Sequence, residues 1–498
     1  MSLLPRPRRR LIWHRRDLRL HDNDIYPMPN EDGQDNDVEI LPLFIFDAHE
    51  FTPQKSMARP VTWDTQWMGP FATKVLVEAV QDLRQSLLAK GHNLMVRYGK
   101  PLEIIPQAIQ SYGISEVVWH EEVGHYEQAL SRQVQTTLRK LFPNVRMTTT
   151  MQYTLYHPDD LPRSGYEWDQ LAHPKQKRKG KNGRRVDGPL SSDAIDDEEG
   201  GQMMQHNLIH VSEDRWKGIP KIMGDFRRAA ASSASVRPAT DPPDLTKIKS
   251  LKDKNFIWGD IPTVRELMKP LQESKKSIMG LSSHQIAKLI SDAEQSSLFQ
   301  GGEKVALARL YDFVHSHGST AQRNMADVIS DNQSSLLSVH LATGSLSPRL
   351  IYHTAKKAQA TCEWLASHMT MRDFFLYTCL ASGSKFYQQG GIPVNKKRAN
   401  SIVWIDWNER TERLWTAWRT GATGLPLVDA AMLELLSTGY CSNRVRQNAV
   451  SVLTNDMRID WRAGAELYQL ILVDHCVGAN YGNWLYFASI GNDPKVGR

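Results

Sequence analysis

Charged and amide side chains suited to binding a buried ligand are concentrated near the C-terminal end of the chain. In residues 439–493 they stand within and beside an apolar pattern at helical spacing, which runs from Asn448 to Ser489 and predicts two helices joined near Asp460. These polar residues are Asn443, Arg444, Arg446, Asp474 and Asn480. Buried charge is costly unless it is paired or contacts a ligand. The segment is therefore either a core with an internal Arg446–Asp474 ion pair, filled by Trp461 and Trp484, or one wall of a ligand site.

The order of the motifs in this segment resembles the flavin-binding part of the photolyase and cryptochrome family, and the spelling is most similar to the DASH-type cryptochromes. The resemblance is carried by SNRVRQN at 442–448, IDWRAGAE at 459–466 and NYGNWLY at 480–486. It implies that FAD is the cofactor. It also implies that Arg446 and Asp474 lie beside the isoalloxazine ring, that Asn480 faces its N5 atom, and that Asn443 and Arg444 line the ring and the substrate mouth.

Three hydroxyl groups precede an expected helix in SSLLSVHLATGSLSPR at 334–349. Free backbone N–H groups and the helix dipole favour a phosphate at such a position, whereas N-capping by Ser334 or Ser338 is the simpler explanation. The run resembles the family's phosphate loop, although Val339 and His340 replace the usual proline and aromatic residue. The resemblance implies that Ser334, Ser335 and Ser338 contact the FAD phosphates.

A second segment, WLASHMTMRDFF at 364–375, resembles a family helix that borders both cofactor and substrate. The resemblance implies that Trp364 flanks the flavin and that Arg372 approaches its phosphates. His368 and Met371 stand where photolyases have a glutamate and an aromatic residue that contact a flipped pyrimidine dimer. Histidine still donates protons near neutral pH and methionine is an adaptable apolar surface, so we expect weakened substrate contact. The alternative is that His368 only lines the pocket.

Two further features bear on electron transfer. Cys476 stands where the family has a second aspartate at the edge of the flavin ring, and its loss of charge is expected to change the redox potential or weaken binding. The resemblance also implies that the side chain at position 480 controls the proton supply to N5. An amide such as Asn480 at this position is typical of photolyases and DASH-type members.

Trp484, Trp461 and Trp407 match the chain of tryptophans that carries an electron to the photoexcited flavin in the family, the last after a one-residue shift. Tryptophans in a helical domain are otherwise more often core residues.

The N-terminal part alternates short apolar runs with amphipathic segments. This pattern predicts strands at 11–13, 40–46, 94–98 and 116–119 and helices at 71–90 and 129–141, hence a doubly wound parallel α/β sheet. No GxGxxG follows the first strand, so a dinucleotide site of that type is not supported. Composition favours a solvated loop at 14–23, whereas WHRRDLRLHDN there resembles the family's opening signature. The family's first domain can hold a folate-type antenna, 5,10-methenyltetrahydrofolate, and the resemblance places Glu122 and Glu127 beside the pterin.

The composition changes along the chain predict three regions. Residues 8–165 are expected to form an α/β domain, residues 166–300 an interdomain linker, and residues 301–498 an all-helical domain, and the resemblance implies that the first holds the antenna and the last binds FAD. The linker carries a low-complexity insertion at about 171–220, with a basic cluster at 175–185 and an acidic one at 193–201. The basic cluster is either a nuclear address or phosphate-backbone contact, or part of a solvated insertion with no dedicated role.

Overall composition sets broad limits. The 498 residues carry a net charge of +6, which is compatible with a polyanionic partner. Four cysteines without CxxC spacing indicate a reduced intracellular compartment and no structural metal. No apolar run reaches the length of a membrane span, and the basic start is too short for a convincing transit or signal peptide.

Two functions follow from these patterns, and a third is weaker. The first is a DASH-type flavoprotein that absorbs blue light and transfers an electron from reduced flavin to cyclobutane pyrimidine dimers, preferentially in single-stranded DNA. The second is a blue-light receptor that acts on a signalling partner without repair, as the changes at His368 and Met371 suggest. Because the sequence ends at Arg498, earlier than is usual in the family, we expect any output to come from the body or the insertion. The third is a dark flavin- or nucleotide-binding protein, consistent with Cys476 and the altered phosphate loop.

Overall fold

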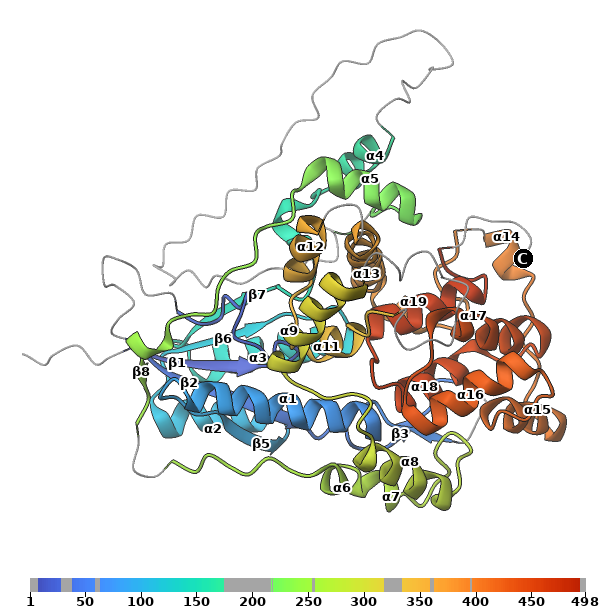
Figure 1. Cartoon of the computed structure of the whole chain (residues 1–498), viewed down its shortest axis with the longest axis horizontal. Coiled ribbons are helices and arrows are strands. Elements are labelled where there is room, and N and C mark those ends of the chain that lie inside the picture. The colour runs from blue at the N-terminus through green and yellow to red at the C-terminus, as the bar shows by residue number, and fades with distance from the viewer. Residues whose placement is uncertain are drawn as a thin grey trace, which may run out of the picture.

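The computed structural model describes residues 8–27, 38–58, 63–173, 216, 218–252, 256–317, 334–358, 362–394 and 396–492. Both charged clusters of the predicted insertion, at 175–185 and 193–201, lie outside these residues. The described part has a parallel sheet with helices on both faces and a large helical region beside it (Figure 1). No helix within the described ranges is long and apolar enough to cross a membrane.

The sheet has the strand order β5-β2-β1-β6-β7, with β8 also paired to β2, and all of these pairings are parallel. The strands are β1 (Arg8–His14), β2 (Val38–Asp47), β5 (Met95–Gly99), β6 (Glu116–His120), β7 (Arg146–Thr150) and β8 (Lys249–Ser250), and β3 (Gln54–Lys55) and β4 (Asp64–Thr65) form a separate antiparallel pair. The four predicted strands are confirmed. β7 was not predicted, because its polar RMTTT sequence lacks an apolar run.

Side chains of alternating strand residues enter two different cores, as expected for a sheet buried on both faces. Ile12 packs with α1 (Pro70–Leu88) on one face, whereas Leu11 and Trp13 pack with α2 (Pro101–Tyr112) and α3 (His125–Leu141) on the other. The core on the α1 side continues without a break into the helical region, where it includes Trp418 and Trp484. The two regions therefore share one hydrophobic core.

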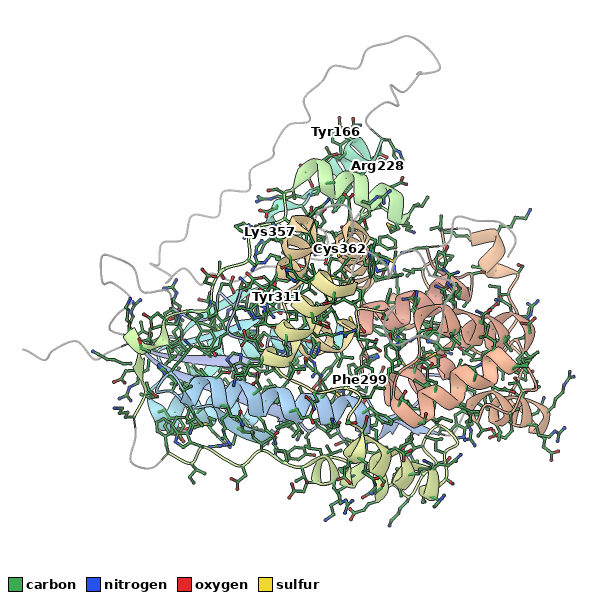
Figure 2. The ribbon with its side chains drawn as sticks, in the orientation of Figure 1. Tyr166, Arg228, Phe299, Tyr311, Lys357 and Cys362 are labelled. Carbon is green, nitrogen blue, oxygen red and sulfur yellow. The ribbon has the colours of Figure 1, made fainter. Side chains whose placement is uncertain are left out.

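The helical region contains most of the described residues that follow β7, and β8 returns to the sheet after the first two of its helices. Its helices are α4 (Gly165–Ala172), α5 (Met223–Ser233), α6 (Val264–Leu267), α7 (Lys269–Gln272), α8 (Ser283–Gln295), α9 (Glu303–Asp312), α11 (Ser338–Thr343), α12 (Pro348–Lys357), α13 (Glu363–Ser382), α14 (Lys396–Asn400), α15 (Glu409–Arg419), α16 (Pro426–Thr438), α17 (Asn443–Ser451), α18 (Trp461–Ile471) and α19 (Val477–Phe487). Figure 2 shows Tyr166 and Arg228 on the outlying α4 and α5 pair, and the Arg228 guanidinium donates to the carbonyl of Ala172 at 3.1 Å.

The prediction of two helices between 448 and 489 is wrong, because three helices occupy this range. α18 does begin after Asp460, whose carboxylate caps it by accepting from the N–H of Arg462 at 3.0 Å. The chain then turns extended at Leu472 and starts again as α19. This break places Asp474 and Cys476 in a connection between helices.

The expectation of a solvated loop at 14–23 is also wrong. Asp17, Arg19 and Asp22 are buried, and Arg19 donates to the carbonyl of Gly344 at 2.8 Å. A Cβ atom at Gly344 would lie 1.8 Å from the backbone oxygen of Arg16, and its φ of 70° also favours glycine. The segment 14–23 is therefore a buried contact between the α/β and helical regions, and its charged side chains make the hydrogen bonds of that contact.

Candidate flavin site

Close packing between α13 and α19 positions the two halves of the candidate site. A Cβ atom at Gly482 would lie 2.3 Å from Cδ1 of Phe375, and one at Gly478 would lie 3.0 Å from Cδ2 of Leu376. Gly478 and Gly482 are four residues apart and therefore lie on the same face of α19, where the absence of side chains allows α13 to pack closely. This contact fixes Arg372 of α13 relative to Asn480 of α19.

Arg446 and Asp474 form the ion pair that the sequence predicts. The Nη2 atom of Arg446 lies 2.9 Å from Oδ1 and 3.1 Å from Oδ2 of Asp474, and Nε donates to the carbonyl of Cys441 at 2.6 Å. Burial has the largest single effect and opposes the charge of Arg446, but the combined effect of Asp474 and of the neighbouring Cys441 and Tyr440 outweighs it and raises the pKa of the guanidinium. The guanidinium therefore keeps its charge, and its side chain is still partly exposed.

Tyr440 joins this pair to the predicted phosphate loop, a link that the sequence analysis missed. The Arg446 guanidinium lies 5.6 Å from the centre of the Tyr440 ring, and the Tyr440 hydroxyl lies 3.5 Å from Oγ of Ser334. Ser334 and Ser335 are held by Arg309, which donates to both backbone carbonyls at 3.0 Å. The only feature of the sequence that could have indicated this link is that Tyr440, an aromatic residue, lies just before the SNRVRQN motif.

The N-capping interpretation of the serines is wrong. α11 begins at Ser338, its N-cap residue is Leu337, and no side chain caps it. The hydroxyl of Ser334 instead accepts weakly from the N–H of Leu336 at 3.4 Å. The three hydroxyl groups of Ser334, Ser335 and Ser338 are therefore not needed to start a helix, and all three side chains are partly exposed.

Trp364, His368 and Met371, which the resemblance places beside the cofactor or the substrate, lie on α13. The rings of Trp364 and His368 lie 5.0 Å apart at 76°, and Met371 is 36% exposed. Solvent reaches His368, yet protein atoms crowd around its ring, and this desolvation lowers its pKa. His368 is therefore a neutral, edge-stacked imidazole at neutral pH.

Arg372 and Cys476 meet through Tyr153, a residue that the sequence analysis did not assign to the site. The Arg372 guanidinium lies 4.3 Å from the centre of the Tyr153 ring and donates to the Tyr153 carbonyl at 2.6 Å. The Tyr153 hydroxyl donates to Sγ of Cys476 at 3.4 Å. The position of the missing aspartate is thus occupied by a thiol bound to a phenol.

Asn480 is buried, and its side-chain amide is oriented by one hydrogen bond. Nδ2 donates to the carbonyl of Ala465 at 3.0 Å. Asn443 and Arg444 lie at the start of α17 and are exposed. The structure therefore separates a buried amide from two solvent-facing polar residues.

A cleft between the two regions is lined by Glu122 and Glu127 from one side and by Tyr153, His475 and Cys476 from the other. Arg15 pairs with Glu122 at 2.9 Å. Burial and the neighbouring charge of Glu122 raise the pKa of Glu127 to about 7, and its Oε2 atom has no hydrogen-bond partner within the described part of the chain. The predicted antenna acids thus share a wall with the Cys476 end of the flavin site.

The three predicted electron-transfer tryptophans are not joined in the predicted order by ring contacts. Trp484 contacts Trp418 at 6.2 Å and Tyr468 at 5.2 Å, whereas Trp461 contacts Tyr481 at 6.0 Å. The remaining contacts of the cluster join Trp418 to Trp415, Trp415 to Trp407, and both Trp415 and Trp407 to Trp63. None of the four cysteines, all of which the structure describes, forms a disulfide bond.

Comparisons with known proteins agree with this geometry. Residues 10–189 match the family described as DNA photolyase, and residues 364–497 match the FAD binding domain of DNA photolyase. The chain is 31% identical to cryptochrome DASH of Danio rerio over 97% of its own length and 77% of the relative, and 30% identical to that of Gloeobacter violaceus over 97% and 80%. A Synechocystis cryptochrome crystal structure superposes with a TM-score of 0.72 at 28% identity, covering all of this chain and 85% of that one.

The chain belongs to the photolyase and cryptochrome family, as an FAD flavoprotein of the DASH type. The donor groups of this chain fit that cofactor. Arg372 Nη2 and Ser442 Oγ are buried and lack hydrogen-bond partners among the described residues. Phosphate oxygens and the polar edge of a flavin would supply the missing acceptors.

Proposed function

We propose that the chain uses blue light to transfer an electron to cyclobutane pyrimidine dimers in DNA, preferentially in a single strand. When bound, FAD supplies light absorption and one-electron chemistry. The observation that carries this proposal is the buried amide of Asn480, fixed by Ala465 beside the connection that holds Asp474 and Cys476. An amide does not release a proton as a carboxylic acid would, so this site supports electron transfer over protonation.

The other residues have supporting roles in the proposal. Arg446 and Asp474 orient the ring, while Arg372, Ser334, Ser335 and Ser338 bind the phosphates. Trp364 flanks the cofactor. Arg444 and Asn443, both exposed, contact the DNA, and the family that residues 10–189 match is described as DNA photolyase. Trp484, Trp461 and Trp407 resupply electrons. A folate antenna would occupy the cleft between Glu122 and Glu127.

A blue-light receptor without repair activity is the second candidate, because the neutral imidazole of His368 and the thioether of Met371 replace a carboxylate and an aromatic ring. A carboxylate accepts hydrogen bonds from a base, and an aromatic ring stacks on it. Both contacts are lost here. Cys476, where a charge is missing, would alter the flavin potential in either function.

The experiment is to illuminate the purified holoprotein with blue light in the presence of dimer-containing single- and double-stranded oligonucleotides. We expect light-dependent loss of dimers, larger on the single strand. Persistence of the dimers on both substrates, with flavin bound and photoreduced, would reject repair and favour the receptor.

A further inference from the structure

We propose that two copies of this chain associate through residues 402–406, which pair with the same residues of the second copy as an antiparallel β ribbon. The two-fold axis of this ribbon passes beside Trp404. The segment belongs to the connection between α14 and α15. The interface lies outside the flavin site and is independent of the repair activity proposed above.

The side chains of this connection alternate between the core and solvent. Ile402 and Trp404 are half-buried and pack against the main core, whereas Val403 and Ile405 are 72% and 37% exposed. Such alternation is that of an extended chain, and none of residues 401–407 has a positive φ. The segment therefore resembles a β strand whose outer face is apolar.

One side of the segment's backbone faces the protein. The N–H of Ile405 donates to the carbonyl of Arg458 at 2.9 Å. In an extended chain, the N–H and C=O groups of successive residues point to opposite sides. The backbone groups of Ile402, Trp404 and Asp406 therefore point away from Arg458.

Four backbone groups on that open side are free. Among the hydrogen bonds of the described residues, none uses the N–H or C=O of Trp404, the C=O of Ile402 or the N–H of Asp406. In contrast, the N–H of Ile402 donates to the carbonyl of Ala399 at 3.2 Å, and the C=O of Asp406 accepts from Oγ1 of Thr411 at 2.7 Å. An edge of this kind is a template for another strand.

Pairing with a second copy uses these four groups. Opposed residues of an antiparallel pair can exchange two hydrogen bonds, so Trp404 opposite Trp404 of the second copy gives two. The N–H of Asp406 then meets the C=O of Ile402 of the second copy, which gives two more by symmetry. The N–H of Ile402 and the C=O of Asp406, which would otherwise extend the ladder, already have partners within the chain. This match favours a second copy over a foreign strand.

The same register brings the exposed aliphatic side chains together. Val403 lies opposite Ile405 of the second copy, at a position without hydrogen bonds, where cross-strand side chains are closest. Four aliphatic side chains then cover one another on the outer face of the ribbon and lose contact with water.

Charges at the two ends of the segment favour the antiparallel orientation. Lys396 and Lys397 of α14 are exposed and, within the described residues, form no ion pair; the same holds for Asp406. The side chain of Glu409 is 97% exposed, and its nearest cation is Arg413 at 3.9 Å. Antiparallel pairing places the basic end of one copy beside the acidic end of the other. Both α14 and α15 lie at the end of the molecule away from the sheet (Figure 1).

The test is sedimentation velocity of the flavin-loaded chain in the presence of a thiol reductant. A short ribbon buries less area than a standard interface, so we expect a dissociation constant of about 10–100 µM. The concentration series should run from well below to well above this range. Monomers at every concentration would overturn the proposal and leave a foreign extended peptide as the occupant of this edge.

Val403→Lys tests the surface, because it places a cation against Ile405 of the second copy. We expect the dissociation constant to rise by about tenfold or more. Leu433→Lys is the matched control, since it adds the same charge at another exposed aliphatic position, on α16, and should dimerise as wild type. Both variants should keep the wild-type circular dichroism spectrum and flavin content. Equal dimerisation by the two variants would show that the dimer uses another surface.

A charge exchange tests the contact between the ends. Lys396→Glu with Lys397→Glu makes both ends acidic, and Asp406→Lys with Glu409→Lys makes both ends basic. Each double variant alone should stay monomeric where wild type dimerises, and an equimolar mixture of the two should form a mixed dimer. A mixture that stays monomeric would overturn the proposed contact between the ends.

Hydrogen exchange tests the pairing itself. The amides of Trp404 and Asp406 should exchange more slowly in the dimer than in the monomer, and in Val403→Lys they should exchange at the monomer rate at every concentration. A dimer in which both amides exchange as fast as in the monomer would overturn strand pairing.

Discussion

Asp22 and Arg349 form a two-point ion pair across the interface of the α/β and helical regions. Nε of Arg349 lies 2.9 Å from Oδ2 of Asp22 and Nη2 lies 2.6 Å from Oδ1, and both side chains are almost fully buried. Ser347 also donates to the Asp22 carboxylate. The charged opening motif thus holds the two regions in the register that the flavin site requires.

Asp22→Asn should destabilise the protein by about 3–5 kcal/mol, because it leaves the buried Arg349 guanidinium without a counter-charge. Denaturant unfolding followed by circular dichroism measures this loss. Asp160→Asn is the control, since its two-point pair with Arg237 is partly exposed and should contribute about 1 kcal/mol or less. Equal losses for the two variants would contradict the clamp.

Arg446→Gln should release flavin from the protein. The substitution leaves Asp474 unpaired beside the ring and removes the charge that this site presents. The ratio of flavin to protein absorbance after gel filtration measures retention. Arg444→Gln, an exposed neighbour on the same helix, should retain flavin and is expected to weaken only DNA binding. Full flavin occupancy in Arg446→Gln would show that the pair is structural.

Because the pKa of Glu466 is raised in the folded protein, we expect the free energy of unfolding to fall as the pH rises. Burial raises its pKa from 4.5 to about 7, although its carboxylate also accepts from the N–H of Met57 at 2.7 Å. The folded state therefore holds a proton that the unfolded state has lost. The free energy of unfolding falls between about pH 4.5 and pH 7, by about 3 kcal/mol from this group.

Glu466→Gln should remove that contribution, because an amide still accepts from Met57 but does not titrate. The difference in unfolding free energy between pH 5 and pH 8 should shrink. Asp373 and Glu127, whose pKa values burial also raises to about 7, contribute with the same sign and keep part of the slope. An unchanged pH dependence in Glu466→Gln would contradict the assignment.

His368→Glu combined with Met371→Trp should increase dimer repair under blue light. The pair restores a hydrogen-bonding carboxylate and a stacking ring on the exposed side of α13. Dimer loss per unit of light, measured at equal flavin content, gives the result. No gain would mean that these two positions do not limit repair. His353→Glu, on α12, is a control for the added charge.

Apolar periodicity in the sequence predicted four strands of the sheet, two helices that cover it and the helical region, whereas the site residues stay predictions. It failed at β7, whose threonines are polar, and at residues 472–476, where one apolar pattern continues through a break between helices. The charged loop at 14–23 was misjudged from composition alone, because its partners Glu303 and Arg349 are about 300 residues away.

Contacts between distant residues could not be predicted from spacing. Tyr153 joins Arg372 to Cys476 across more than 200 residues, and Trp63 joins the tryptophan cluster from the other domain. Neither residue was assigned to the site from the sequence, because an aromatic side chain by itself suggests only core packing. The motifs named Trp407, Trp461 and Trp484, but only the structure reveals the ring contacts of Trp418 and Trp415.

The wavelength dependence of dimer loss tests the central claim most directly. Holoprotein with reduced flavin would be illuminated at a series of wavelengths with a dimer-containing single strand, and repaired dimers counted per absorbed photon. The account predicts that repair follows the absorption spectrum of the bound flavin. Dimers that persist at every wavelength, while the flavin remains bound and reduced, would contradict light-driven electron transfer to DNA.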